Sequence, residues 1–190
     1  MHPIFEMLTG EDRRSIGRAS EVVNRVLKEP HLFDALISGM LLNDPILRMR
    51  CADVVEKVTA IHPEYLLPYK RIFLDALRKI EQAEVRWHVA PILARLSLSD
   101  DELKSAVNVL IDFLKDRSSI VKTAAIQALY ELTMRNQSLL PLVLGHIKDV
   151  VVTGTPAMQA RSRKLLAKLS RLTTVVSRSN FPSSHSQSAA

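Results

Sequence analysis

Apolar residues recur along this chain three or four positions apart, and no stretch alternates with a period of two for long enough to form a strand. Between residues 119 and 134, for example, Val121, Ala125, Leu129 and Leu132 fall on one face of a helix. The same spacing predicts helices over residues 10–28, 31–42, 45–60, 63–80, 82–97, 100–115, 119–134, 138–152 and 156–171. The expected fold class is therefore all-α.

Capping residues and prolines in the sequence predict where the helices begin and end. Asp44 precedes Pro45, a pairing suited to the first turn of a helix, and Ser99 with Glu102 forms a capping box. The last stretch, 173–190, is rich in serine and too poor in apolar residues to offset its ordering entropy. We therefore expect a helical domain over residues 1–172 and a disordered Ser-rich tail over 173–190.

The helices repeat as pairs. An apolar residue followed by a basic or polar one recurs with spacings of 38, 36 and 37 residues, at Leu47-Arg48, Val85-Arg86, Val121-Lys122 and Met158-Gln159. The helices between these also repeat: Leu66-Leu67-Pro68 lies two periods before Leu139-Leu140-Pro141. A period near 37 residues that contains two helices predicts an α-solenoid, in which stacked hairpins share a continuous core.

At these positions the chain resembles the HEAT-repeat family, which belongs to the armadillo-like α-solenoids. The resemblance rests on Asp44-Pro45, on Leu47-Arg48 followed by Cys51-Ala52, and on Val121-Lys122 followed by Ala124-Ala125. It covers roughly residues 13–171 and implies a right-handed α–α superhelix of four to five hairpins, with the second helix of each pair lining the concave side. The chain departs from the family pattern at Gln82, Ser118, Thr155 and Gln159, and at Pro91, where we expect a kink.

Composition narrows the function classes. The chain has 190 residues with only five glycines, which argues against a glycine-rich phosphate-binding loop. The single cysteine, Cys51, cannot form an intramolecular disulfide and is expected to be inert packing in a reducing compartment. No secretory leader and no apolar run near ~18 residues is evident, so we expect a cytoplasmic protein without a membrane span.

The positive charge is concentrated near the C-terminal end. The formal net charge is +6, and residues 150–190 contain basic residues but no Asp or Glu. Arg161, Lys164, Lys168 and Arg171 fall three or four positions apart on one helical face. This face is interpreted either as a polyanion-binding surface or as the polar cap that a terminal repeat requires.

On the expected concave strip, the best candidates for contact with another protein are Arg50, Trp87, His88, Arg95 and Tyr130. Tryptophan, tyrosine and arginine are common interface anchors. Core packing between repeats is an equally good interpretation of Trp87. The repeated basic residues Arg48, Arg86 and Lys122 have a structural interpretation, since such side chains bridge neighbouring loops in arrays of this kind.

Nothing in the sequence indicates catalysis or a cofactor. The histidines are not spaced as zinc ligands, and no phosphate-loop, dinucleotide-binding or nucleophile-elbow motif occurs. We therefore expect a non-catalytic scaffold that binds another protein. Two alternatives stay open: nucleic-acid binding through the basic helix, and an alkylated-DNA glycosylase, an activity found in some HEAT-like arrays, which would use residues such as Trp87 and Asp53.

Overall fold

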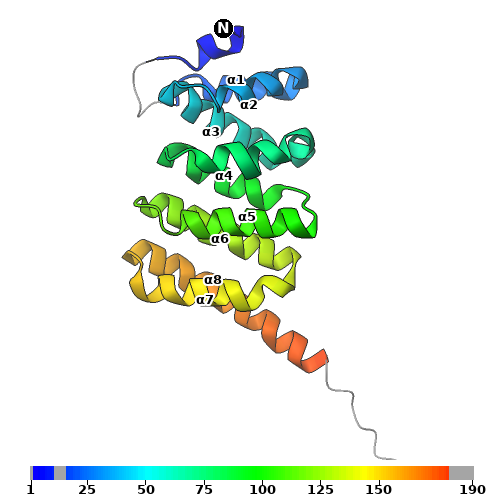
Figure 1. The fold of residues 1–190 in the computed structure, drawn as a ribbon, viewed down its shortest axis with the longest axis vertical. Helices are drawn as coiled ribbons and strands as arrows, with labels where there is room; N and C mark the ends of the chain where they lie inside the picture. Colours follow the sequence, from blue (N-terminus) through cyan, green and yellow to red (C-terminus); the bar gives the residue numbers. More distant parts are fainter. Residues whose placement is uncertain (1, 11–15, 180–190) are drawn as a thin grey trace, which may run out of the picture.

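The chain folds entirely into helices. The computed structural model describes residues 2–10 and 16–179, with side chains as far as residue 171. Every regular element within these ranges is a helix, which confirms the all-α class. The helices lie in layers along the long axis of the molecule, in chain order, with the N-terminal helix at one end and α7 and α8 at the other (Figure 1).

The α-helices are α1 (Ala19–Lys28), α2 (Phe33–Gly39), α3 (Pro45–Ile61), α4 (Ala83–Arg95), α5 (Asp100–Phe113), α6 (Ser119–Arg135), α7 (Leu140–Thr153) and α8 (Pro156–Ser179). Shorter turns of 3-10 helix form η1 (Pro3–Met7), η2 (Pro30–Leu32), η3 (Pro63–Tyr69), η5 (Leu77–Lys79) and η6 (Gln137–Leu139), and η4 (Ile72–Ala76) is a π-helix. The predicted helices over 45–60, 82–97, 100–115 and 119–134 are thus present with small changes at their ends.

Two sets of helices build the layers. α1, α3, α4, α6 and α8 contact one another in succession, while α2, α5 and α7 pack against α3, α6 and α8. The contacts within the first set are close because small residues lie there: Ala52, Ala90 and Ala125 are fully buried. The core is consequently continuous from one layer to the next.

The capping residues act as the sequence indicates. The Asp44 carboxylate accepts hydrogen bonds from the amides of Ile46 (2.9 Å) and Leu47 (3.0 Å) at the start of α3. At the start of α5, the Ser99 amide donates to Glu102 (2.8 Å) and the Glu102 amide donates to the Ser99 hydroxyl (3.4 Å). These contacts satisfy amides that have no partner within the helix and so fix where each helix begins.

The segment 63–80 differs from the single helix that was predicted. It forms η3, η4 and η5 in succession. Pro68 lies inside η3 and has no amide hydrogen, and its ring would clash with the carbonyl of residue 64 in a regular α-helix. The apolar spacing is still used, because Leu66, Phe73 and Leu77 are buried.

Both ends of the helical region also differ from expectation. The helix predicted over 10–28 begins at Ala19, and residues 11–15 lie outside the described residues. Gly17, just before it, has φ +58°, a left-handed conformation that ends helical geometry there. α8 continues to Ser179, beyond the predicted domain boundary at 172, because each added residue extends a helix that is already nucleated. Residues 180–190 of the predicted tail lie outside the described residues.

Of the three repeated basic residues, Arg86 bridges neighbouring loops as the sequence indicated. Arg48 and Arg86 each donate from Nε to a carbonyl six residues earlier, at Leu42 (3.0 Å) and Ile80 (2.9 Å). Arg86 also bridges to the next loop, where its Nη1 donates to Asp116 (2.6 Å). Burial raises the pKa of the Asp116 carboxyl, but the Ser118 amide and the Arg86 guanidinium outweigh it and hold that pKa below its ordinary value.

Candidate functional site

The five residues proposed for protein contact lie on α3, α4 and α6, which pack side by side, but Arg50 is not at the surface. Its side chain is only 2% exposed. Its Nη1 donates to the carbonyls of Leu8 (2.8 Å) and Thr9 (2.6 Å), in the segment that follows η1. The interpretation of Arg50 as an exposed contact residue is therefore wrong, because the N-terminal segment covers this part of α3.

His88 and Trp87 form a half-buried pair on α4. Their ring centroids are 5.9 Å apart, and Trp87 packs against the core. His88 Nε2 lies 3.9 Å from the Asp53 carboxylate, whose other oxygen accepts from Lys57 (2.7 Å). Burial lowers the pKa of His88; the nearby Asp53 and Glu56 carboxylates oppose the shift but do not cancel it. The imidazole is thus held toward its neutral form, and Trp87 contributes to the core while keeping part of its ring accessible.

Arg95 joins two layers. Its Nη2 pairs with the Glu56 carboxylate (2.5 Å) and its Nη1 donates to the Glu56 carbonyl (2.8 Å) on α3. Arg135 makes a similar contact one layer later, donating to the Leu96 carbonyl (3.3 Å). In both cases a residue donates to a carbonyl 39 positions earlier. Arg95 therefore acts mainly in packing α4 on α3.

Tyr130 lies where the two predicted surfaces meet. The Lys168 ammonium, from the basic face of α8, is 5.9 Å from the centroid of the Tyr130 ring on α6. Arg161 likewise reaches α6, where its Nε donates to Gln127 Oε1 (3.1 Å). Gln127 in turn donates to Glu131 (2.7 Å). Arg161 and Lys168, two of the four proposed polyanion-binding residues, therefore contact α6, the helix that carries Tyr130.

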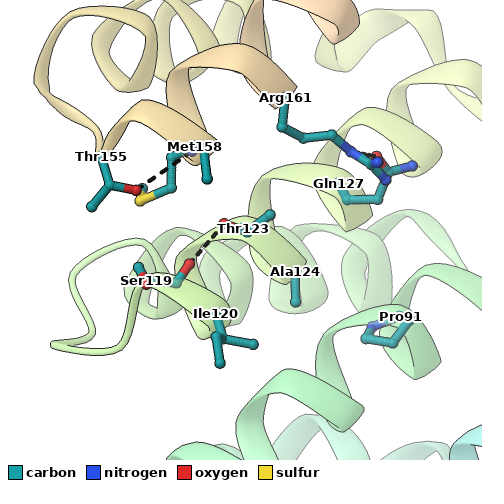
Figure 2. Close-up of a pocket in the computed structure, with 10 residues that line it drawn as sticks. Pro91, Ser119, Ile120, Thr123, Ala124, Gln127, Thr155, Met158 and Arg161 are labelled. Carbon is teal, nitrogen blue, oxygen red and sulfur yellow. Dashed lines mark hydrogen bonds between the residues drawn. The ribbon is translucent and has the colours of Figure 1, made fainter.

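A groove of about 430 Å³ lies beside these contacts, between the first turns of α6 and α8. Figure 2 shows Thr155, Met158 and Arg161 on its α8 side and the first turns of α6 opposite them, with Pro91 contributed by α4. Its lining is mostly apolar. The lining residues are Pro91, Ser119, Ile120, Thr123, Ala124, Gln127, Thr155, Ala157, Met158 and Arg161.

Ile120 is the residue of this groove that sequence reasoning missed. Its side chain is 57% exposed, although isoleucine is usually buried. It directly precedes Val121, the repeated apolar position, and so lies off the core-facing side of α6. An apolar residue at a position that the repeat leaves to solvent is the signal that could have identified it.

The cations on the basic face of α8 have no acidic partner among the described residues. α8 contains no Asp or Glu. Arg161, Lys164, Lys168 and Arg171 are exposed, and none forms an ion pair with a carboxylate in the described part of the chain. In the earlier layers, by contrast, Arg86 and Arg95 are paired with Asp116 and Glu56. The end of the molecule nearest the groove thus carries uncompensated positive charge.

Other kinds of chemistry find little support in these side chains. Within residues 2–10 and 16–171, no three His, Cys, Asp or Glu side chains are grouped so as to hold a metal ion. Burial raises the pKa of the Cys51 thiol to about 12, so it is protonated and unreactive at neutral pH. None of the described helices has the length and hydropathy needed to cross a bilayer.

Comparison of the chain with protein-family models, with curated proteins and with solved structures finds no match.

Proposed function

We propose that this chain is a non-catalytic, cytoplasmic scaffold that binds another protein along one face of a short, right-handed α-solenoid of HEAT-like hairpins. The binding face is formed by α3, α4, α6 and α8, which would be the concave side of the array. On this proposal the regular positions hold the array together, and the positions that depart from the repeat bind the partner.

The solenoid part of the proposal is supported by contacts that recur from layer to layer. Arg95 donates to the Glu56 carbonyl in the C-terminal half of α3, and Arg135 donates to the carbonyl of Leu96, which directly follows α4; each acceptor is in the preceding layer. Gln82 at the start of α4 donates to the Pro45 carbonyl (2.8 Å) at the start of α3, 37 residues earlier. Contacts of this kind, which join each hairpin only to its neighbour, are typical of repeat proteins.

The protein-binding part is carried by one observation, the groove between α6 and α8 with Ile120 exposed in its wall. An accessible apolar groove bordered by arginine has the composition of an interface core with a polar rim. Trp87 and Tyr130, both partly accessible, lie on neighbouring helices of the same face. The unpaired cations of α8 favour nucleic-acid binding as the second candidate, since several cations on one helix attract phosphates.

The test is differential capture with a variant that changes the groove alone. The full chain and the Ile120→Asp variant are immobilised and exposed to lysate of the native cell, and bound proteins are quantified. Ile120 is exposed in the first turn of α6, where a carboxylate is favourable to the helix, so the variant is expected to fold. Val152→Asp, at a 77% exposed position on α7, is the matched control.

We expect a set of proteins that is retained by the wild type and by Val152→Asp but lost from Ile120→Asp, with similar melting temperatures for all three chains. Equal capture by Ile120→Asp would contradict the assignment of the groove. If nuclease treatment of the lysate abolished all capture, nucleic acid would be the ligand instead.

A further inference from the structure

We propose that the groove between α6 and α8 binds an acidic peptide segment of the partner protein. One apolar side chain of that segment enters the groove against Ile120 and Met158, and neighbouring Asp or Glu residues pair with Arg161 and Lys164. This inference rests on the proposed function and adds the chemistry of the partner.

The size of the groove favours a peptide segment. Its volume of about 430 Å³ lies near the lower end of the ~300–1,000 Å³ range of ligand sites. This is room for one or two side chains of a short segment. The apolar wall formed by Ile120, Ala124 and Met158 favours insertion of an aliphatic or aromatic residue, because burial of apolar surface on both sides is favourable.

The position of the Arg161 guanidinium allows it to donate hydrogen bonds to a carboxylate. Its Nε donates to Gln127 Oε1 (3.1 Å), and Gln127 is itself held by its hydrogen bond to Glu131 (2.7 Å). Figure 2 shows the guanidinium of Arg161 reaching across from α8 to Gln127 at the edge of the groove. Its Nη1 and Nη2 make no hydrogen bond to the described residues. A guanidinium fixed in this way can bind a carboxylate with little further loss of side-chain entropy.

The charge around the groove selects the sign of the ligand. Lys164 lies one turn beyond Arg161 on the same face of α8 and is exposed. Neither cation is paired with a carboxylate of the described chain, and α8 offers none. An acidic segment supplies the missing charge, and such complementarity contributes to specificity and to the rate of association.

The apolar groove distinguishes this ligand from a nucleic acid. Phosphates would use the cations of α8 but would leave the exposed Ile120 side chain without an apolar partner. An acidic peptide with one large apolar residue uses both features, and Figure 2 shows Arg161 at the edge of the groove.

The experiment selects ligands for the full-length chain from a displayed library of random peptides and measures the selected peptides by fluorescence anisotropy. The variants are Ile120→Ala and Arg161→Gln. Their matched controls are Val152→Ala and Lys148→Gln, at exposed positions of α7 outside the groove. Added salt is the second variable, because rim charges are screened at high ionic strength.

We expect the selected peptides to combine one large apolar residue with adjacent Asp or Glu. Each groove variant should weaken binding about tenfold, as loss of an interface anchor does, and the controls should leave it unchanged. Binding should also weaken as salt is raised.

Peptides that are apolar but not acidic, and that depend on Ile120 but not on Arg161, would overturn this inference while leaving the proposed function intact. If no peptide binds in a groove-dependent way and differential capture also fails, both are refuted. The inference would also be refuted, in favour of nucleic acid, if labelled duplex DNA bound the chain more tightly than any selected peptide and lost this binding in Arg161→Gln.

Discussion

Replacing Arg50 by methionine tests whether this residue is a buried anchor or a contact residue. Methionine keeps a long flexible chain of similar volume but removes the guanidinium. In the structure this group is buried and donates to the carbonyls of Leu8 and Thr9, which join the N-terminal segment to α3. The substitution therefore leaves two carbonyls without their charged donor.

The expected loss follows from those two hydrogen bonds. A hydrogen bond from a charged donor contributes about 1.5–3 kcal/mol net. Two such bonds would give about 3–6 kcal/mol, and the methionine side chain recovers about 1–2 kcal/mol by remaining buried. We expect the free energy of unfolding to fall by about 2–4 kcal/mol.

Urea denaturation followed by far-ultraviolet circular dichroism measures this loss. Amide hydrogen exchange of residues 4–8 shows whether the N-terminal segment is the part that is released. Arg71→Met is the matched control, because Arg71 is exposed and such a substitution changes stability by less than about 0.5 kcal/mol.

Arg50 does not anchor the N-terminal segment if Arg50→Met is as stable as Arg71→Met and residues 4–8 keep their protection from exchange. Loss of partner capture with unchanged stability would restore the interpretation of Arg50 as a contact residue.

Two further substitutions test packing and titration. Gly39→Ala would place a Cβ 2.5 Å from the Cys51 sulfur and 3.0 Å from the Phe5 ring, so we expect a loss of about 1–3 kcal/mol in thermal melts. Adding Cys51→Ala removes the nearer clash, and a double variant whose loss equals the sum of the single losses would contradict this explanation. The pKa of His88 lies below its ordinary value of 6.5, so the folded chain binds fewer protons than the unfolded chain just below that pH. The stability contributed by neutral His88 is present above pH 6.5 and is lost as the pH falls toward the pKa of the folded state. His88→Gln should flatten this dependence of the free energy of unfolding on pH. If the curves of wild type and variant against pH are parallel, another group titrates.

The sequence predicts a helix well where an N-capping residue directly precedes a run of apolar residues with helical spacing. α3 and α5 begin where Asp44 and Ser99 indicate, because each of these side chains bonds to amides within its own turn. The prediction of a single helix over residues 63–80 is wrong because helical spacing indicates only which residues face the core. It does not report that Pro68 prevents a regular backbone, so the same buried residues are held by 3-10 and π turns.

The site was predicted less well than the fold. Arg50 was placed at the surface because the repeat contains no information about the N-terminal segment, whose contacts with it span more than 40 positions. The basic face of α8 was located, but its contacts with Gln127 and Tyr130 depend on how α8 packs on α6. The place of Ile120 beside Val121 indicates that it is exposed, but its position in the wall of a groove depends on how α8 packs on α6, which periodicity does not describe.

The short helix η1 has a consequence for how such an array can change in length. Ile4, Phe5 and Leu8 are buried, and η1 contacts α1 at the first end of the molecule. That end is therefore closed: a hairpin inserted ahead of α1 would displace η1 and expose the apolar residues beneath it. Behind α7 and α8 no such element is present among the described residues, and Leu142 and Val152 are exposed there. A further hairpin stacked behind α7 and α8 would displace none of the described helices, whereas one ahead of α1 would displace η1.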